Sequence, residues 1–443
     1  MTPASHLHAS LQILEDIDRA QRPADAIISG WFRFQRGLED YDRGAILDMV
    51  NGVLRHRGRI GWWLERQKRP DTPRLRLLAY MILVRRKTPE GLERHFSGAP
   101  YAPEELTDSE FALLNKLQGH TIEHPDMPEE VRLECPDWAA EPLRRRFGED
   151  FAAEMAALLD PPTLDLRVNT LRTRRADILR ELKSAGLPAS DTPLSPQGIR
   201  LDERLPLNLI AGLKRGEVEI QDEGSQLVAL LLGAKPGDRV VDFCAGAGGK
   251  TLALAAQMAN KGRIIACDIN PARLKRAAER LRHAGVHNAE TRQLSSETDK
   301  WVKRHKLSFD RVLIDAPCSG TGTWRRNPDA RWRDIEGNGI EGLLALQARI
   351  LVSASRLVKP GGRLVYATCS LLPEENEAQV TRFLGVQPEF KLVPLAEAAP
   401  PDLGLGGGKY LSLTPAQHQT DGFFAAVLER AALPAEEAPK AEA

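Results

Sequence analysis

Two cysteines follow apolar segments in the second half of the chain, each in a short polar loop. The run 313–314 leads through Asp315 to Cys318, and the run 365–367 leads through Thr368 to Cys369. Open α/β sheets place their sites at the carboxyl ends of strands, and a thiol there can act as a covalent nucleophile. The alternative is a pair of inert thiols, since free cysteine is often a core residue.

A glycine-rich turn follows an earlier apolar run. The run 239–243 predicts a short buried parallel strand, and a helical pattern starts at Lys250. The residues between them are Cys244, Ala245, Gly246, Ala247, Gly248 and Gly249. Glycines let a backbone approach a ligand closely, and a helix N-terminus offers free N–H groups. The spacing matches neither the dinucleotide fingerprint Gly-x-Gly-x-x-Gly nor a P-loop.

The next apolar run, 263–267, ends at Asp268. A carboxylate at this place suits the hydroxyl groups of a ribose. Together, the turn and the acid predict an adenosine ligand that needs no diphosphate, such as S-adenosylmethionine. The alternative is a tight turn of an α/β sheet that binds an unrelated ligand.

These groups together could carry out one reaction. Carbon 5 of a pyrimidine is a poor nucleophile, but a thiolate that adds to carbon 6 turns carbon 5 into an enamine-like centre that can attack a methyl group. A carboxyl group such as that of Asp315 would share a proton with N3 and the exocyclic amine of the base. A base must then remove the proton on carbon 5 so that the thiol can leave.

Three motifs closely resemble those of the Nop2/Sun family of RNA cytosine-5 methyltransferases, whose bacterial members include the small-subunit ribosomal RNA methyltransferase B type. They are Asp242–Thr251, Asp315–Gly322, and Ala367–Ser370 with Glu374–Glu377. The resemblance extends from about Leu164 to Leu428 and includes the segment 221–226. It implies methyl transfer from S-adenosylmethionine to carbon 5 of a cytosine in RNA, with 16S ribosomal RNA as the expected substrate.

The resemblance also implies a role for each motif. Cys369 matches the family's nucleophile, and Cys318 matches the second cysteine, which is associated with release of the methylated base. DNA cytosine-5 enzymes use the opposite order. Asp315 matches the acid that contacts the base or the edge of the cofactor. The segment from Cys244 to Lys250 matches the cofactor loop, and Asp268 matches the ribose-binding acid.

The chain departs from the family's pattern at two places. Ala247 stands where the cofactor loop usually has proline, and alanine keeps the turn but stiffens it less. The segment 291–297 has serine where many members have an acid near the adenine, so we do not carry that role over. Lys250 also has an alternative interpretation as a solvent-exposed lysine at a helix start.

Strands and helices alternate from Pro236 to about Arg430, which predicts a doubly wound, parallel, Rossmann-like sheet. The expected strands are 239–243, 263–267, 310–314, 363–366 and 422–427. The expected helices are 250–259, 271–283, 342–357 and 373–384.

The preceding residues predict a helical domain and then a small α+β module. Helical spacing recurs from Leu11 to about Val84, with Asp40 or Asp42 as the expected cap of the third helix and Thr72 as the start of the fourth. We assign Trp62 and Trp63 to the core or edge of this domain in preference to base stacking. The domain loosely resembles the NusB-type RNA-binding domain. The predicted division is 1–135 (helical), 136–233 (α+β), 234–430 (methyltransferase) and 431–443 (disordered tail).

The composition limits the class of protein. The 443 residues are 42% hydrophobic and contain no apolar run long enough to span a bilayer. No secretory signal is visible, and the five cysteines lack Cys-x-x-Cys spacing, which argues against a disulfide framework or a zinc site. We expect a cytoplasmic monomer without a metal or a membrane partner.

The 61 basic and 61 acidic residues balance, but the charge is unevenly distributed. Between Arg55 and Lys87, eleven Lys or Arg face only Glu65 and Asp71, which indicates either a solvated helical face or a patch that binds an RNA backbone. A second cluster follows the Pro-Cys loop and predicts phosphate contacts beside the target base. Its members are Arg325, Arg326, Arg331 and Arg333. The alternative is that they order their own loop against Asp329 and Asp334.

Two other functions fit parts of the chain. A methyltransferase fold can serve as an RNA-binding or ribosome-assembly factor without turnover, although both cysteines and the glycine turn are present here. An enzyme that methylates an exocyclic amine typically carries an Asn/Asp-Pro-Pro-Tyr/Phe loop, which the segment Asp315–Cys318 does not match.

Overall fold

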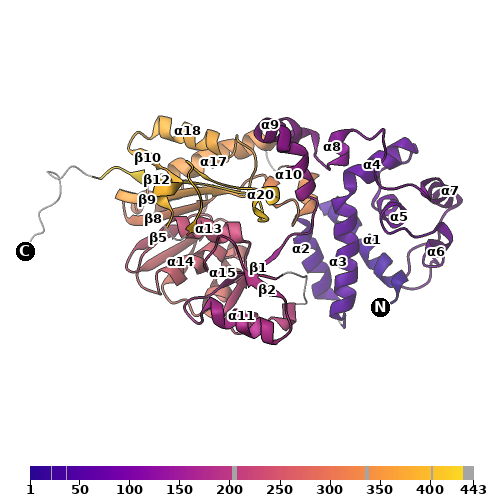
Figure 1. The fold of residues 1–443 in the computed structure, drawn as a ribbon, viewed down its shortest axis with the longest axis horizontal. Coiled ribbons are helices and arrows are strands. Elements are labelled where there is room, and N and C mark those ends of the chain that lie inside the picture. Colours follow the sequence, from indigo (N-terminus) through magenta and orange to yellow (C-terminus); the bar gives the residue numbers. More distant parts are fainter. Residues whose placement is uncertain are drawn as a thin grey trace, which may run out of the picture. The chain divides into compact units, whose positions relative to one another are not determined.

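The computed structural model describes residues 1–20, 22–35, 37–201, 207–333, 335, 339–400 and 403–432. The chain divides into two compact units (Figure 1). Unit 1 comprises Met1–Pro161 with Thr323–Asp334, and unit 2 comprises Pro162–Gly322 with Ile335–Ala443. Most of the predicted tail, 433–443, lies outside the described residues. The finer division into three domains stays a prediction.

Unit 1 is helical over its N-terminal segment. Its helices are α1 (Pro3–Ala20), α2 (Ala24–Phe34), α3 (Asp40–Arg55), α4 (Arg57–Arg66), α5 (Pro73–Leu83), α6 (Pro89–Glu93), α7 (Asp108–Leu117), α8 (Glu129–Arg132), α9 (Asp137–Phe147) and α10 (Phe151–Ala157). Their apolar faces share one core that contains Trp63, whose ring nitrogen donates to Ile122 O at 2.9 Å, so the assignment of this tryptophan to the core is confirmed.

The predicted helix caps of unit 1 had different outcomes. Thr72 caps α5 as expected, because its hydroxyl accepts a hydrogen bond from Leu75 N. The cap predicted for the third helix is wrong. The N-cap of α3 is Glu39, without a side-chain cap, and Asp42 is buried in the first turn of the helix, where its carboxylate contacts the His6 ring at 2.7 Å.

Unit 2 begins with a small antiparallel sheet in the order β2-β3-β1-β4. Its elements are β1 (Leu164–Val168), α11 (Arg175–Ser184), β2 (Ala189–Asp191), β3 (Gly198–Leu201), α12 (Ala211–Lys214) and β4 (Val218–Ile220). Apolar side chains of α11 and the strands form a separate core around Leu166, Ile178 and Ile199.

The second sheet of unit 2 has eight strands, seven of them in the order β10-β12-β9-β8-β5-β6-β7, with β11 paired to β12. The strands are β5 (Arg239–Asp242), β6 (Arg263–Asp268), β7 (Ala289–Gln293), β8 (Phe309–Asp315), β9 (Val358–Thr368), β10 (Phe390–Val393), β11 (Leu411–Leu413) and β12 (Phe423–Arg430). The Rossmann-like α/β fold is confirmed. The sheet is parallel only from β7 to β9, however, because β12 runs antiparallel to β9, and β10 and β11 run antiparallel to β12.

Helices cover both faces of this sheet (Figure 1). One apolar core joins it to α13 (Glu223–Leu231), α14 (Gly249–Gln257), α15 (Pro271–His283) and α19 (Leu395–Ala398). The core of the other face includes α16 (Lys300–Arg304), α17 (Gly339–Ser355) and α18 (Glu377–Val386). Strand β5 lies between β6 and β8, so the chain order reverses beside it, and such a switch point is where open α/β sheets bind ligands.

Candidate active site

The glycine turn lies directly after β5, and two of its glycines adopt left-handed backbone angles. Gly246 has φ +55° and Gly248 has φ +83°. A Cβ atom on Gly248 would lie 3.0 Å from that of Ala277 on α15, whereas one on Gly246 would meet no atom within 4 Å. Gly248 is therefore required by both its backbone angle and helix packing, and the space above Gly246 is open to a ligand.

Asp268 ends β6 and lies against this turn. Its carboxylate accepts hydrogen bonds from Gly246 N at 2.9 Å and from Asn270 N at 2.8 Å. Each oxygen keeps a further lone pair, so the group can still accept bonds from two hydroxyls. The acid that the sequence assigns to a ribose thus lies beside the turn that would hold the rest of the nucleoside.

Asp242, at the end of β5, is fully buried under the turn. Thr251 Oγ1 donates to its Oδ2 at 2.7 Å, while Oδ1 has no hydrogen-bond partner among the described residues. Burial raises the pKa of Asp242 to about 7, and the nearby charge of Asp315 adds to this rise. From the sequence we assigned this acid no role of its own, although it lies in the predicted strand 239–243 and begins the first family motif.

Lys250 and Asp315 form an ion pair at the centre of the site, 2.7 Å from Nζ to Oδ2. Lys250 is 8% exposed, so the alternative of a solvent-exposed lysine is wrong. Burial opposes the positive charge of Lys250, but Asp315 outweighs it and the pKa of the lysine is raised. The pair thus joins the start of α14 to the end of β8.

The two cysteine loops meet at the ends of β8 and β9. The Sγ atoms of Cys318 and Cys369 lie 3.3 Å apart, and both residues are partly exposed. This exposure does not fit the alternative of two buried, inert thiols. The hydrogen bond to Cys369 and then burial raise the pKa of Cys318 well above its usual value. The raised pKa favours the protonated form of Cys318.

The comparisons with known proteins agree with this geometry. A sequence profile described as 16S rRNA methyltransferase RsmB/F matches residues 229–429, and one described as an RsmF/B-like ferredoxin-like domain matches residues 135–208. A ribosomal RNA small subunit methyltransferase B of Klebsiella pneumoniae is 31% identical over 415 residues, which cover 89% of this chain and 91% of the relative. The chain belongs to the ribosomal RNA small subunit methyltransferase B family. The resemblance to Nop2/Sun methyltransferases is thereby confirmed.

Two further similar proteins match nearly the whole length of this chain. A Synechocystis protein named "Probable ribosomal RNA small subunit methyltransferase B" is 30% identical over 446 residues, which cover 95% of this chain and 98% of the relative. The crystal structure of the protein PH0851 superposes with a TM-score of 0.80 at 27% identity and covers 97% of this chain and 99% of that one. The methyltransferase B fold therefore accounts for both units.

Two of the four arginines after the Pro-Cys loop, Arg325 and Arg331, are buried and do not form the phosphate contact that the sequence predicted, whereas Arg326 and Arg333 are partly exposed. In this methyltransferase B chain, the segment Thr323–Asp334 packs within unit 1. Arg331 is 1% exposed and donates to Glu134 O at 3.0 Å and Leu158 O at 2.7 Å, and Arg325 is 4% exposed. Buried guanidinium groups cannot reach a phosphate. Arg333 instead pairs with Asp329 at 3.1 Å, as the alternative predicted, while Asp334 lies outside the described residues.

Much of the basic run Arg55–Lys87 is also bound within unit 1. Arg59 pairs with Glu134 at 3.0 Å, Arg74 with Glu110 at 2.7 Å, and Arg76 with Asp18 at 2.9 Å. These acids lie outside the run, so counting charges within it overstated its free positive charge. Exposed members remain; they are Arg66, Lys68, Arg85, Arg86 and Lys87, of which Arg66 pairs with Asp126 at 3.0 Å and Arg85 with Asp48 at 2.6 Å.

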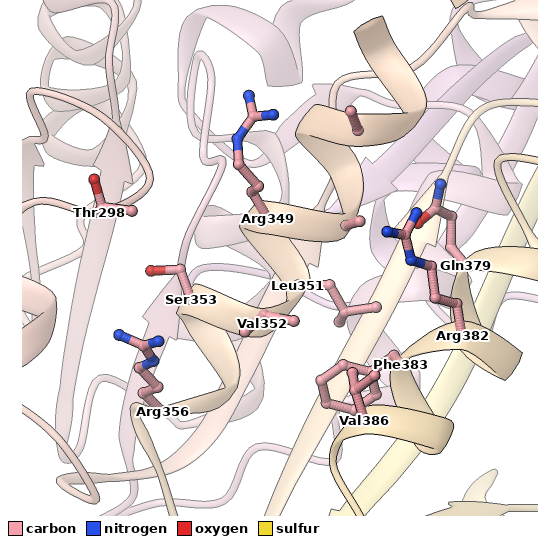
Figure 2. A pocket seen from close by; sticks show the side chains of 12 residues that line it. Thr298, Arg349, Leu351, Val352, Ser353, Arg356, Gln379, Arg382, Phe383 and Val386 are labelled. Carbon is pink, nitrogen blue, oxygen red and sulfur yellow. The ribbon is translucent and has the colours of Figure 1, made fainter. Parts of the chain in front are cut away.

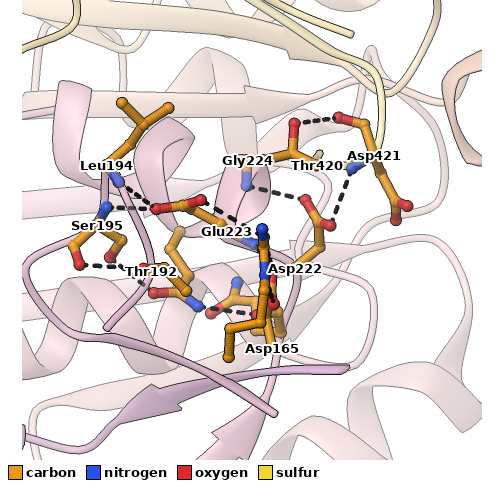
Figure 3. A network of polar contacts seen from close by, with 12 residues as sticks. Asp165, Thr192, Leu194, Ser195, Asp222, Glu223, Gly224, Thr420 and Asp421 are labelled. Atoms are coloured by element: carbon orange, nitrogen blue, oxygen red, sulfur yellow. Dashed lines mark hydrogen bonds and ion pairs between the residues drawn. The ribbon is translucent and has the colours of Figure 1, made fainter. Parts of the chain in front are cut away.

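The segment 221–226, which also resembles the family, joins the small sheet to the methyltransferase sheet (Figure 3). Asp222 accepts from Gly224 N at 2.8 Å and Asp421 N at 2.9 Å, and the fully buried Glu223 accepts from Ser195 N at 2.7 Å. Asp165 on β1 binds Arg200 through both oxygens, at 2.7 and 2.9 Å. This network has a structural role.

A cavity of about 440 Å³ is lined mainly by residues of α17 and α18 (Figure 2). Arg349, Ser353 and Arg356 of α17 and Phe383 of α18 are among its lining residues, and none of the predicted site residues is. Arg349 is held by Glu297 at 2.8 Å. The cavity is therefore separate from the cysteine pair. Among the described residues, we find no helix with the length and apolar character to cross a membrane.

Proposed function

We propose that this protein transfers a methyl group from S-adenosylmethionine to carbon 5 of a cytosine in RNA, with 16S ribosomal RNA as the substrate. The observation that carries the proposal is the 3.3 Å separation of the Cys318 and Cys369 sulfurs beside the glycine turn. The family profile described as 16S rRNA methyltransferase RsmB/F supports the choice of RNA. The proposed site residues are those named from the sequence, with the Lys250–Asp315 pair at their centre.

The residues of the turn fit an adenosine cofactor. The open space above Gly246, the remaining lone pairs of Asp268 and the unpartnered Oδ1 of Asp242 all belong to one small region of the sheet edge. Cys244 to Lys250 would hold the cofactor, with Asp268 on its ribose and Asp315 at its edge. S-adenosylmethionine, when bound, supplies an electrophilic methyl group.

The chain's own groups account for the remaining chemistry. The Cys369 sulfur adds to carbon 6 of the cytosine, which makes carbon 5 nucleophilic. Asp315, held by Lys250, shares a proton with N3 and the exocyclic amine and so stabilises the adduct. After methyl transfer, the bond from carbon 6 to the Cys369 sulfur breaks as that sulfur takes the proton of the Cys318 S–H group, and the Cys318 thiolate that this leaves accepts the proton lost from carbon 5. We assign Cys318 to this release step, since its S–H group lies beside the departing sulfur.

Separate cysteine variants test this assignment. Without the attacking thiol no adduct can form, so Cys369→Ala should be inactive and trap no RNA. Without the releasing thiol the adduct forms and stalls, so Cys318→Ala should accumulate a protein–RNA complex that survives denaturing gel electrophoresis and disappears in the double variant. Cys135→Ala, which removes a buried thiol of unit 1, is the matched control.

The outcomes separate the alternatives. Accumulation of the adduct in Cys369→Ala would reverse the two roles, and two active variants that trap nothing would rule out covalent catalysis by these thiols. Release of tritium from RNA labelled at carbon 5 of cytosine distinguishes this reaction from methylation of the amine. Wild-type protein that binds RNA without methylating it would instead indicate an assembly factor.

Bisulfite mapping of total RNA with and without the protein then locates the cytosine, which we expect in an unpaired or loop segment because extrusion costs least there.

A further inference from the structure

Glu375 lies between the two cysteine loops and is completely buried. Its Oε1 accepts hydrogen bonds from Ser319 N and from Gln347 Nε2, both at 2.8 Å. Its Oε2 accepts from the hydroxyl of Ser319 at 2.5 Å and from the hydroxyl of Ser370. The four donors that the described residues supply are all uncharged, so this carboxylate is held by dipoles and not by an ion pair.

The donors come from three separate segments of the fold. Ser319 follows Cys318 directly, Ser370 follows Cys369 directly, and Gln347 lies on α17. Gln347 also donates to Pro317 O at 3.0 Å, on the other side of Cys318. The contacts of Glu375 therefore bind the residue after each cysteine to one carboxyl group and fix that group against a helix.

The neighbouring Asn376 holds the second loop from the other side. Its Oδ1 accepts from Thr368 Oγ1 at 2.5 Å, and its Nδ2 donates to Ser370 O at 2.9 Å. Cys369 is thus bracketed by the residues before and after it. Among the described residues, the hydrogen bonds of the Asn376 side chain go to the Cys369 loop alone, whereas Glu375 contacts both loops.

A carboxylate is the group that this place requires. It offers only acceptors, on two oxygens with about four lone-pair positions, and here four donors point at it. Glutamine has the same shape but would turn an NH₂ group toward two of these donors. A buried donor without an acceptor costs about 1–3 kcal/mol, so one or both loops would move to find another partner.

We propose that Glu375 is a positioning residue that sets the register of the two cysteine loops, so that the thiols of Cys318 and Cys369 face each other and reach the same base. The inference rests on the proposed function for the identity of that base, but the pairing of the thiols does not depend on it. The carboxylate acts through the two loops and does not touch the reacting atoms.

The charge of Glu375 also affects the two thiols differently, because it favours the protonated form of Cys318. Cys318 is faced by Cys369 and Glu375 and lies near Tyr366, whereas Lys250 lies near Cys369. The negative charge of Glu375 adds to the hydrogen bond and the burial that raise the pKa of Cys318. Glu375 therefore favours a protonated Cys318, which leaves attack to Cys369.

The rate at which Cys318 and Cys369 form a disulfide reports the register of the two cysteine loops without RNA. Diamide takes up the two thiol hydrogens as the S–H bonds of both cysteines break and the S–S bond forms. We expect rapid formation of the Cys318–Cys369 disulfide in the full-length wild-type protein, because sulfurs 3.3 Å apart need only a small shift to reach bonding distance. The rate is followed by mass spectrometry of the linked peptide.

Glu375→Gln should slow this disulfide at least tenfold. It should also lower kcat at least tenfold while KM for RNA and for the cofactor stays within twofold, because the Glu375 side chain is completely buried and acts through the cysteine loops. The control is Gln379→Ala on α18, a buried polar side chain that donates to Leu344 O and lies outside both loops. It should leave the disulfide rate and kcat unchanged.

Ser319→Ala and Ser370→Ala remove one donor each and guard against a folding defect in Glu375→Gln. Each should slow the disulfide by a smaller factor. A wild-type protein that forms no Cys318–Cys369 disulfide, or a Glu375→Gln protein that forms it as fast as wild type, would overturn the inference. Failure of Cys318→Ala to trap RNA while Glu375→Gln still slows the disulfide would overturn the proposed function alone.

Discussion

Asp242 gives this protein an acid whose effect on stability can be calculated. It is fully buried, and the burial raises its pKa from 3.8 to about 7. The folded state therefore binds a proton that the unfolded chain has already lost between about pH 4 and pH 7. Stability is highest with the proton bound, and raising the pH through this interval destabilises the fold.

The shift of about three pKa units corresponds to about 4 kcal/mol, at 1.36 kcal/mol per unit. About 3 kcal/mol of this falls between pH 5 and pH 8, because the unfolded carboxyl is already largely ionised at pH 5. Asp242→Asn resembles the protonated acid and does not titrate. The variant should therefore gain about 3 kcal/mol relative to wild type when the pH rises from 5 to 8.

Urea denaturation at pH 5, 6, 7 and 8 measures this difference in the free energy of unfolding. Asp177→Asn, which changes an exposed acid on α11 of the same unit, is the control and should show no such trend. A difference between Asp242→Asn and wild type that stays flat with pH, or that falls, would refute the assignment of a raised pKa to Asp242.

Three further changes test the site and its support. Asp268→Ala should weaken S-adenosylmethionine binding about ten- to hundredfold, because charge-assisted hydrogen bonds contribute about 1.5–3 kcal/mol; unchanged affinity by calorimetry would remove this acid from the cofactor site. Gly248→Ala should lower the free energy of unfolding more than Gly246→Ala, because only the former places a Cβ 3.0 Å from the Cβ of Ala277; equal losses in urea denaturation would make the backbone angle the sole cause. Arg331→Ala should lower the unfolding free energy by about 3 kcal/mol, since two buried carbonyls lose their donor, yet leave the salt dependence of RNA binding unchanged. A flatter salt dependence in that variant would show that Arg331 does meet phosphate.

The parts of the fold with strong local patterns could be predicted from the sequence. Each of the five predicted strands of the second sheet is present, as are the four helices, with ends shifted by a few residues. Continuous apolar runs followed by glycine or polar turns identify buried strands well, because a strand covered on both faces needs apolar side chains throughout. The Rossmann-like class depends on these central elements and not on the edges.

The edges of the sheet were harder to predict. Strand β7, Ala289–Gln293, is mostly exposed and contains Glu, Thr, Arg and Gln, so it has no apolar run and is held by its pairing with β6. The direction of β12 also has no local signal, because an apolar run reads the same in a parallel and an antiparallel strand. The helical segment from Asp137 to Ala157 is divided into α9 and α10 around Gly148, whose φ is +54°.

Long-range contacts account for the errors about charge. Arg331 looked like an exposed arginine in a polar loop, but its partners Glu134 and Leu158 lie 197 and 173 residues away in the chain. The acids that neutralise the basic run likewise lie outside it. Composition over a local window shows how many charges are present, but burial depends on which distant segments pack around them.

The cysteine pair shows where the sequence stops being informative. Parallel strands β8 and β9 pair Asp315 with Ala367, and each cysteine follows within three residues, so motif position alone brings thiols 51 residues apart to one place. The pairing of β8 with β9 places the two cysteines in the same region, but only to within a few ångströms. Covalent addition and release at one base require both sulfurs within contact distance. The ladder between β8 and β9 ends before Cys318, and beyond it the loops meet directly where Gly322 N donates to Cys369 O at 3.0 Å and Leu371 N donates to Thr321 Oγ1 at 2.7 Å. Glu375 adds, from a third position in the sequence, one carboxyl group that accepts from the residue after each cysteine.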